Sequence, residues 1–195
     1  MKSIYKTNFF DSDTFEIIKK CVFDQLNDES TVSYGEELKR YYKVVFLPKE
    51  IESMLLEKAK KETGDDSLDV VYIQIVNYKI KDGAVPALRD HKDVTTGEWV
   101  MDIVIDGTID WPLVINGTSF SNAPNSVFFI RGEEDTHGRP DFPSENENDY
   151  LILLFVHLAN KDSDYMRMSK KILSMEESAL KAFLKAASPA WRKES

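Results

Sequence analysis

Six short predicted strands, separated by turn residues, dominate this chain from residue 86 to residue 159. They lie near residues 86–93, 98–106, 112–115, 118–121, 126–131 and 150–159, and strand-like segments at 41–47 and 69–80 precede them. Short segments bounded by glycine, asparagine and proline are typical of antiparallel strands. Because no helical pattern alternates with the six segments, they favour a sandwich or jelly roll over a sheet built from βαβ units.

Two helices are expected before this region. Apolar residues recur at helical spacing over about residues 13–27, where Asp13 and Glu16 have the spacing of a capping box. A second apolar stripe follows Pro48 and runs to Gly64. Proline suits a first helical turn and glycine suits a helix end, so both boundaries are marked in the sequence.

The chain length of 195 residues suits one domain with a substantial core. We expect a mainly β (α+β) fold, in which a helical N-terminal scaffold at residues 1–68 and a helical C-terminal extension at 161–195 flank a β core at 69–160. Apolar periodicity in the extension predicts a helix over residues 169–187.

The net charge and the cysteine content limit the classes of function that the protein can have. The 25 basic and 34 acidic residues give a net charge of −9, which disfavours nucleic acid as a partner. Cys21 is the single cysteine, so no disulfide can form within the chain. No apolar run has the length of a signal peptide or a membrane span, and we expect a cytoplasmic protein without a membrane partner.

Two of the three histidines border the β-rich region. His91 and Asp93 point to the same side if their segment is extended, because side chains of a strand alternate. His137 follows 46 residues after His91, which leaves enough chain for the intervening strands to bring it back. Two imidazoles and one carboxylate on one side of a metal suit a non-haem Fe(II) site. The alternative is a surface ion cluster at His91 and Asp93 and an unrelated loop histidine at 137.

These residues resemble the facial triad of the 2-oxoglutarate- and Fe(II)-dependent dioxygenases, particularly the small prolyl-4-hydroxylase-like members. The resemblance covers about residues 70–159 and extends to the neighbourhood of Trp111-Pro112 and to the His137-Gly138-Arg139-Pro140 run. It implies a double-stranded β-helix, a jelly-roll or cupin-like core. It also implies catalytic iron held by His91, Asp93 and His137, with 2-oxoglutarate and O2 as co-substrates.

The chain departs from the family pattern at the residues that bind the co-substrate. Most members bind the remote carboxylate of 2-oxoglutarate through an arginine or lysine on the last core strand, but residues 140–159 contain no basic residue except His157. Arg139 is our first candidate for that role, because a guanidinium matches a carboxylate and Arg139 shares a face with His137 if extended.

Further co-substrate candidates flank Arg139 in this interpretation. Tyr78 matches the tyrosine that donates to the same carboxylate in the resembled domains, although an ordinary strand tyrosine would fit the pattern equally well. His157 shares a face with apolar strand residues, which favours a core histidine, yet it would help to anchor the co-substrate if that face lines the barrel. Arg131 and Lys79 are alternative cations.

The resemblance implies hydroxylation of an unactivated C–H bond in an amino acid, a peptidyl side chain or another small molecule. Relatives that halogenate replace the carboxylate ligand by a small residue, so Asp93 favours hydroxylation or a related oxidation. Two alternatives remain at this stage: a cupin-like metalloenzyme that does not use 2-oxoglutarate, and a metal-free jelly-roll binding protein. The oligomeric state is left open.

Overall fold

The computed structural model describes residues 3–27, 32–93, 97–164 and 166–167, and most of its regular structure is antiparallel sheet. The larger sheet has seven strands, in the order β1 (Ile4–Lys6), β8 (Val127–Arg131), β5 (Trp99–Gly107), β10 (Tyr150–Asn160), β4 (Leu68–Lys79), β3 (Arg40–Val45) and β2 (Ser33–Gly35). The smaller sheet has three, in the order β7 (Thr118–Phe120), β6 (Leu113–Ile115) and β9 (His137–Gly138).

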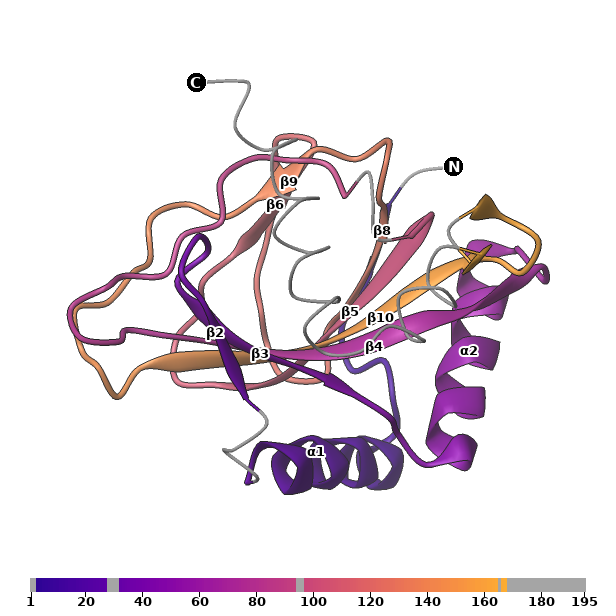
Figure 1. Cartoon of the computed structure of the whole chain (residues 1–195), viewed down its shortest axis with the longest axis horizontal. Helices are drawn as coiled ribbons and strands as arrows, with labels where there is room; N and C mark the ends of the chain where they lie inside the picture. Colours follow the sequence, from indigo (N-terminus) through magenta and orange to yellow (C-terminus); the bar gives the residue numbers. More distant parts are fainter. Residues whose placement is uncertain (1–2, 28–31, 94–96, 165, 168–195) are drawn as a thin grey trace.

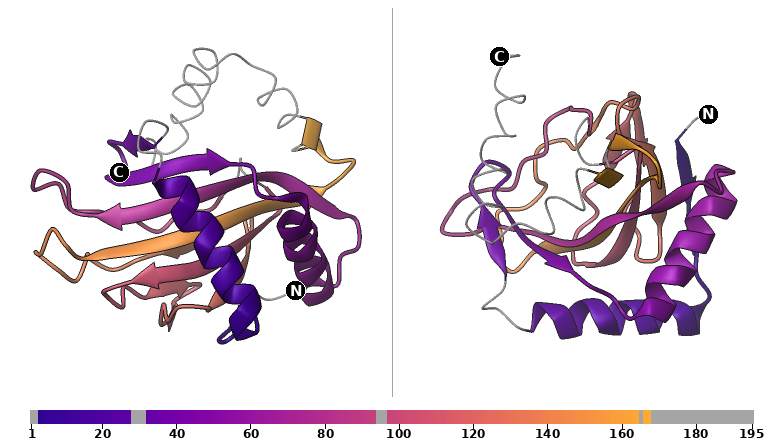
Figure 2. Two further views of the ribbon diagram at one scale, coloured as in Figure 1. Left: turned by 90° about the horizontal axis from the view of Figure 1, so that it is seen from below. Right: turned by 45° about the vertical axis from the view of Figure 1, so that its right-hand side comes forward.

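The two sheets and two helices form layers. Helices α1 (Ser12–Leu26) and α2 (Lys49–Thr63) lie against one face of the seven-stranded sheet, and the smaller sheet lies over the other face (Figure 1). Seen from the helical side, α1 crosses the strands at an angle and α2 packs near the end of β4 (Figure 2). Both faces of the central strands are therefore covered.

Alternating side chains of these strands build two separate cores. In β10, Ile152, Leu154 and Val156 point to the helices, whereas Leu151 and Leu153 point to the smaller sheet. Strand β5 is buried over most of its length for the same reason. A strand covered on both sides can carry an unbroken apolar run, which explains the near-continuous hydrophobic sequence of β10.

The predictions of the two helices before the β-rich region are confirmed, with one correction at a cap. Asp11, rather than Asp13, caps α1: its side chain accepts a 2.9 Å hydrogen bond from the backbone N–H of Thr14. Asp13 lies inside the first helical turn, where a negative charge is favourable. Helix α2 begins after Pro48 and ends at Gly64, whose φ of 69° is a left-handed cap.

Most expected strands are present, but the segment 86–93 is not one. It is an irregular segment that meets β9 through a single bridge between His91 and His137. The short strands β1, β2 and β9, of two or three residues each, were not predicted. The expected helix at 169–187 lies outside the described residues. Within the described part of the chain, no helix is long and apolar enough to span a membrane.

Candidate metal centre

His91, Asp93 and His137 come together as the sequence predicts, with one potential ligand atom from each lying within 4.8 Å of the others. The Nε2 atom of His91 is 3.5 Å from Asp93 Oδ1, and the Nε2 atom of His137 is 3.4 Å from Asp93 Oδ2. The side chains are largely buried, with exposed fractions of 10%, 17% and 6% in chain order. The prediction that these three residues meet in space is confirmed.

The outer nitrogen of each imidazole faces a main-chain carbonyl. Nδ1 of His91 is 2.8 Å from the oxygen of Arg89, and Nδ1 of His137 is 3.2 Å from the oxygen of Asp135. Because a carbonyl only accepts, each Nδ1 is placed to donate its proton outward, and a ring that is neutral then presents its Nε2 lone pair inward. Two lone pairs and a carboxylate then converge, and this set of donor atoms fits a divalent metal ion.

The electrostatics of the triad also favour the binding of a cation. Burial opposes ionisation of Asp93, but the imidazoles of His137 and His91 outweigh it and hold the pKa of this carboxyl well below its ordinary value. Burial also opposes charging of His137, yet the hydrogen bond with Asp93 and its negative charge raise the pKa of His137. The carboxylate of Asp93 thus stays negatively charged. It stabilises positive charge beside it, either on a protonated imidazole or on a bound metal ion.

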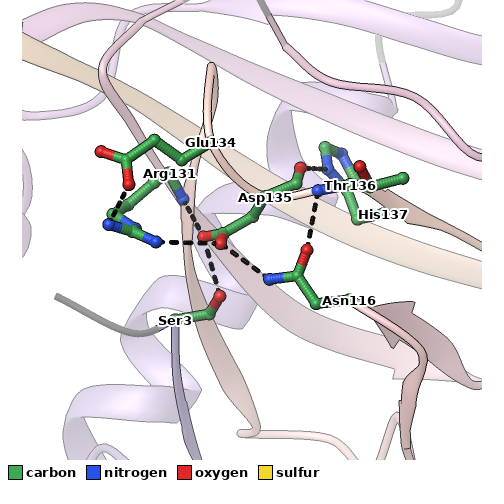
Figure 3. Close-up of polar contacts among 7 residues, drawn as sticks. All are labelled: Ser3, Asn116, Arg131, Glu134, Asp135, Thr136 and His137. Atoms are coloured by element: carbon green, nitrogen blue, oxygen red, sulfur yellow. Dashed lines mark hydrogen bonds and ion pairs between the residues drawn. The ribbon is translucent and has the colours of Figure 1, made fainter.

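A network behind β9 fixes the backbone that carries His137 (Figure 3). The buried carboxylate of Asp135 accepts hydrogen bonds from Ser3 Oγ at 2.7 Å, from Asn116 Nδ2 at 2.8 Å and from the backbone N–H of Arg131 at 2.9 Å. Asn116 also accepts from the backbone N–H of Thr136 at 3.0 Å. Three separate segments therefore hold the two residues that precede the ligand.

A cavity of about 110 Å³ opens beside the triad, between the two sheets. Its walls come from inward-facing positions of β3, β4, β5, β6, β8, β9 and β10 and from the segment before His91. The apolar part of the lining comprises Leu38, Leu88, Val100, Leu113, Ile130 and Phe155, and the polar part includes Arg40, Tyr72, Gln74, Tyr78, Asp102, Arg139 and His157. A small polar ligand beside a bound metal would thus meet both polar groups and apolar walls.

All three predicted co-substrate residues line this cavity. Tyr78 is fully buried, and its ring meets Trp111 edge to face. Arg139 is also buried, donates through Nη1 to the carbonyl of Trp111 and places Nη2 3.9 Å from Asp102 Oδ2. His157 stacks on Tyr72 with ring centroids 4.1 Å apart.

The two alternative cations lie elsewhere. Arg131 pairs with Glu134 and, at 3.3 Å, with Asp135. Lys79 lies over the ring of Tyr41, 4.9 Å from its centroid, and neither Arg131 nor Lys79 lines the cavity.

The sequence reasoning missed two charged residues of the cavity. Asp102 lies within an apolar strand and on the same face as Val100 and Val104. A lone acidic residue on that apolar face is the sequence feature that could have identified it. Arg40 comes from β3, far earlier in the sequence, and no local pattern links it to the triad. Burial raises the pKa of Asp102 to about 6, against the opposing charge of Arg139.

Several buried polar atoms of the lining have no hydrogen-bond partner among the described residues. They are both ring nitrogens of His157, Oδ1 of Asp102 and Nε of Arg139. Buried polar groups in native proteins are almost always satisfied, by protein, water or ligand. The cavity is therefore built for polar contents.

No family model matches the chain, and the comparison with curated proteins finds no match either. Solved structures do match. An oxidoreductase of the 2OG-Fe(II) oxygenase family from Burkholderia pseudomallei aligns with a TM-score of 0.60 at 13% identity, over 81% of this chain and 85% of the other. A Pseudomonas putida prolyl-4-hydroxylase aligns at 0.58 and 10% identity, over 80% and 92%.

This chain has the fold of the 2-oxoglutarate/Fe(II) oxygenases. The neighbours of this fold are not all hydroxylases. The non-haem α-ketoglutarate-dependent epimerase SnoN from nogalamycin biosynthesis aligns at a TM-score of 0.58 and 8% identity, over 84% of this chain and 83% of the other. At such identities the likeness concerns the fold, and the chemistry has to be argued from the residues of this chain.

Proposed function

We propose that this protein is an Fe(II)- and 2-oxoglutarate-dependent oxygenase that oxidises an unactivated C–H bond. One observation carries the proposal: Asp93 lies between the inward-facing Nε2 atoms of His91 and His137, at 3.5 and 3.4 Å. That donor set leaves the remaining positions of a bound metal open toward a cavity whose lining includes unsatisfied polar atoms.

We further infer that the core is a double-stranded β-helix. Successive strands after β4 divide between the two sheets, with β5, β8 and β10 in the larger and β6, β7 and β9 in the smaller. The structural neighbours among oxygenases support this assignment. Such an arrangement explains why the ligands at 91, 93 and 137 meet at one open end.

Each side chain of the site then has a defined task. The imidazoles of His91 and His137 and the carboxylate of Asp93 would hold the iron. Tyr78, Arg139 and His157 would line the co-substrate site, since each offers a polar group inside the cavity. The apolar lining around Val100 and Ile130 keeps bulk water from the reacting groups.

The overall reaction balances without a further reductant. Bound iron and 2-oxoglutarate supply the oxidising chemistry: one oxygen atom of O2 enters succinate as CO2 is lost, and the other accounts for the oxidation of the substrate. The substrate class that we propose is a small molecule, an amino acid or a peptidyl side chain. Hydroxylation is the outcome that Asp93 favours, because this ligand occupies the position that a halide would need.

Anaerobic addition of Fe(II) and then 2-oxoglutarate tests the proposal. We expect a visible charge-transfer band in the wild-type protein and in Lys92→Ala. Lys92 is exposed and stands between His91 and Asp93 in the sequence. Asp93→Ala should lack the band. Succinate formed on exposure to O2 would complete the support.

Two results would point to other functions. A metal site without any response to 2-oxoglutarate would select a metalloenzyme that does not use this co-substrate. Absence of metal binding in the wild-type protein would indicate a metal-free binding protein that has the fold of an oxygenase.

A further inference from the structure

Arg40 brings a second guanidinium into the cavity from outside the oxygenase-like core. Strand β3 pairs antiparallel with β4, with Tyr41 opposite Asn77, so the preceding residue, Arg40, lies on the side of Tyr78. Arg40 Nη1 donates to the hydroxyl of Tyr78 at 2.6 Å. Its guanidinium also lies over the rings of Tyr78 and Phe155, at 5.5 and 5.9 Å from the centroids.

Arg40 and Arg139 differ in how their charge is balanced. Arg139 has Asp102 at 3.9 Å and donates to a main-chain carbonyl. In the part of the chain that the structure describes, no carboxylate lies within 4.0 Å of the Arg40 guanidinium, although the residue is half-buried. A second carboxylate at Arg139 would lie close to that of Asp102, whereas one at Arg40 would meet a cation that has no carboxylate within ion-pair distance among the described residues.

Tyr78 completes the geometry at Arg40. Its hydroxyl oxygen accepts from Arg40, so its own proton is available to another acceptor. The hydroxyl is buried in the cavity wall, where a hydrogen bond is stronger than in water. An acceptor that meets both the Tyr78 proton and the remaining Arg40 donors is best supplied by a carboxylate.

Resting on the function proposed above, we propose that Arg40 and Tyr78 together bind the distal carboxylate of the oxo acid. Arg139 then serves as a buried cation, held by Asp102, that adds positive potential. The cation that selects a dicarboxylic co-substrate thus comes from the hairpin of β2 and β3. It takes the place of the basic residue that the last strand, β10, lacks.

Isothermal titration calorimetry with Mn(II) in place of iron tests this without turnover. The probes are 2-oxoglutarate and 2-oxopentanoate, which carries a methyl group where the distal carboxylate would be. Because the carboxylate makes charge-assisted hydrogen bonds, we expect the wild-type protein to prefer 2-oxoglutarate by roughly 10-fold or more. Arg40→Met should lose most of this preference, and Arg40→Lys should retain part of it.

Lys39→Gln is the matched control, since it removes an exposed positive charge one residue away and should keep the wild-type preference. Should Arg40→Met fail to fold, Arg40→Gln removes the charge and keeps a donor for Tyr78. An Arg40 variant that folds and still shows the wild-type preference would overturn the role of Arg40 alone. A wild-type protein that binds Mn(II) but neither oxo acid would remove the proposed function together with this inference.

Discussion

His91 and His137 are joined to each other through their main chains as well as through the proposed metal. The backbone N–H of His91 donates to the carbonyl of His137 at 2.9 Å, and the N–H of His137 donates back at 2.8 Å. The rings lie with centroids 4.3 Å apart. This reciprocal pair fixes the distance between the two ligands before any cation is bound.

Removal of the carboxylate ligand should abolish tight metal binding. We expect Asp93→Ala to lower the affinity for Fe(II) or Mn(II) by about 100-fold or more, since loss even of groups that only support ligands costs 10–100-fold. Metal content after anaerobic reconstitution and dialysis measures the effect. Lys92→Ala should bind like the wild type, and equal metal content in Asp93→Ala would contradict the assignment.

A glycine beside the triad should be required for metal binding, although it is not a ligand. A Cβ at Gly132 would lie 2.7 Å from the carbonyl oxygen of Asp93 and 2.5 Å from that of Gly97. Gly132→Ala should therefore displace Asp93, lower metal affinity by roughly 10-fold and destabilise the fold by about 1–3 kcal/mol.

Gly35→Ala provides the control for this substitution. Its Cβ would meet its nearest neighbour, Tyr42 Cε1, at an ordinary 3.5 Å, so its metal affinity and melting temperature should stay near those of the wild type. Normal metal affinity in a folded Gly132→Ala protein would show that Asp93 does not depend on this close approach.

Metal affinity should fall as the solution becomes more acidic. Asp93 raises the pKa of His137, so protons compete with the metal for its Nε2 atom from a higher pH than at an isolated histidine. Below that raised pKa we expect affinity to drop by about 10-fold per pH unit for each proton displaced. Titrations with Mn(II) from pH 8 down to about 5.5 measure the slope, and a flat profile would exclude a histidine ligand.

Burial lowers the pKa of His157 from its ordinary 6.5 to about 4, and this should make the metal-free protein sensitive to acid. Between these values the unfolded chain binds a proton that the folded chain does not. The contribution to stability is complete above about pH 6.5 and is lost as the pH falls toward 4, by up to about 3 kcal/mol.

His157→Phe removes this titrating group and should flatten the dependence on pH. Urea unfolding at pH 7 and at pH 4.5 measures the change in unfolding free energy for both proteins. Identical changes in wild type and variant would mean that the buried imidazole is charged in the folded state.

The triad was predictable from the sequence because two of its residues are close together in the chain and few histidines could supply the third. His91 and Asp93 are two residues apart, and only three histidines exist in the chain to supply a partner. The longer strands that carry the cavity were predictable as well, since strands of five or more residues have clear apolar patterns, whereas the two-residue β9 was not predicted. The segment 86–93 was mistaken for a strand, although it contains no valine, isoleucine, threonine, tyrosine or phenylalanine. In the structure it is attached to the neighbouring chain by the bridge at His91 and by the hydrogen bond from the N–H of Arg139 to the carbonyl of Leu88.

Arg40 and Asp102 could not be assigned to the site in this way. The position of Arg40 depends on the pairing of β3 with β4, which no short-range pattern specifies. Asp102 could have been noted as a lone acid within an apolar strand, but its partner Arg139 is 37 residues later, and only the fold brings them together. Long-range pairing, rather than local propensity, decides which polar side chains share a cavity.

The hairpin of β2 and β3 lies at the edge of the larger sheet and contributes Arg40 without contributing any proposed metal ligand. Under the two proposals above, the cation that selects the oxo acid would come from a stretch of chain separate from the iron ligands. Grafting a hairpin with a different residue at position 40 would redirect the enzyme to another 2-oxo acid while its iron centre stays as built.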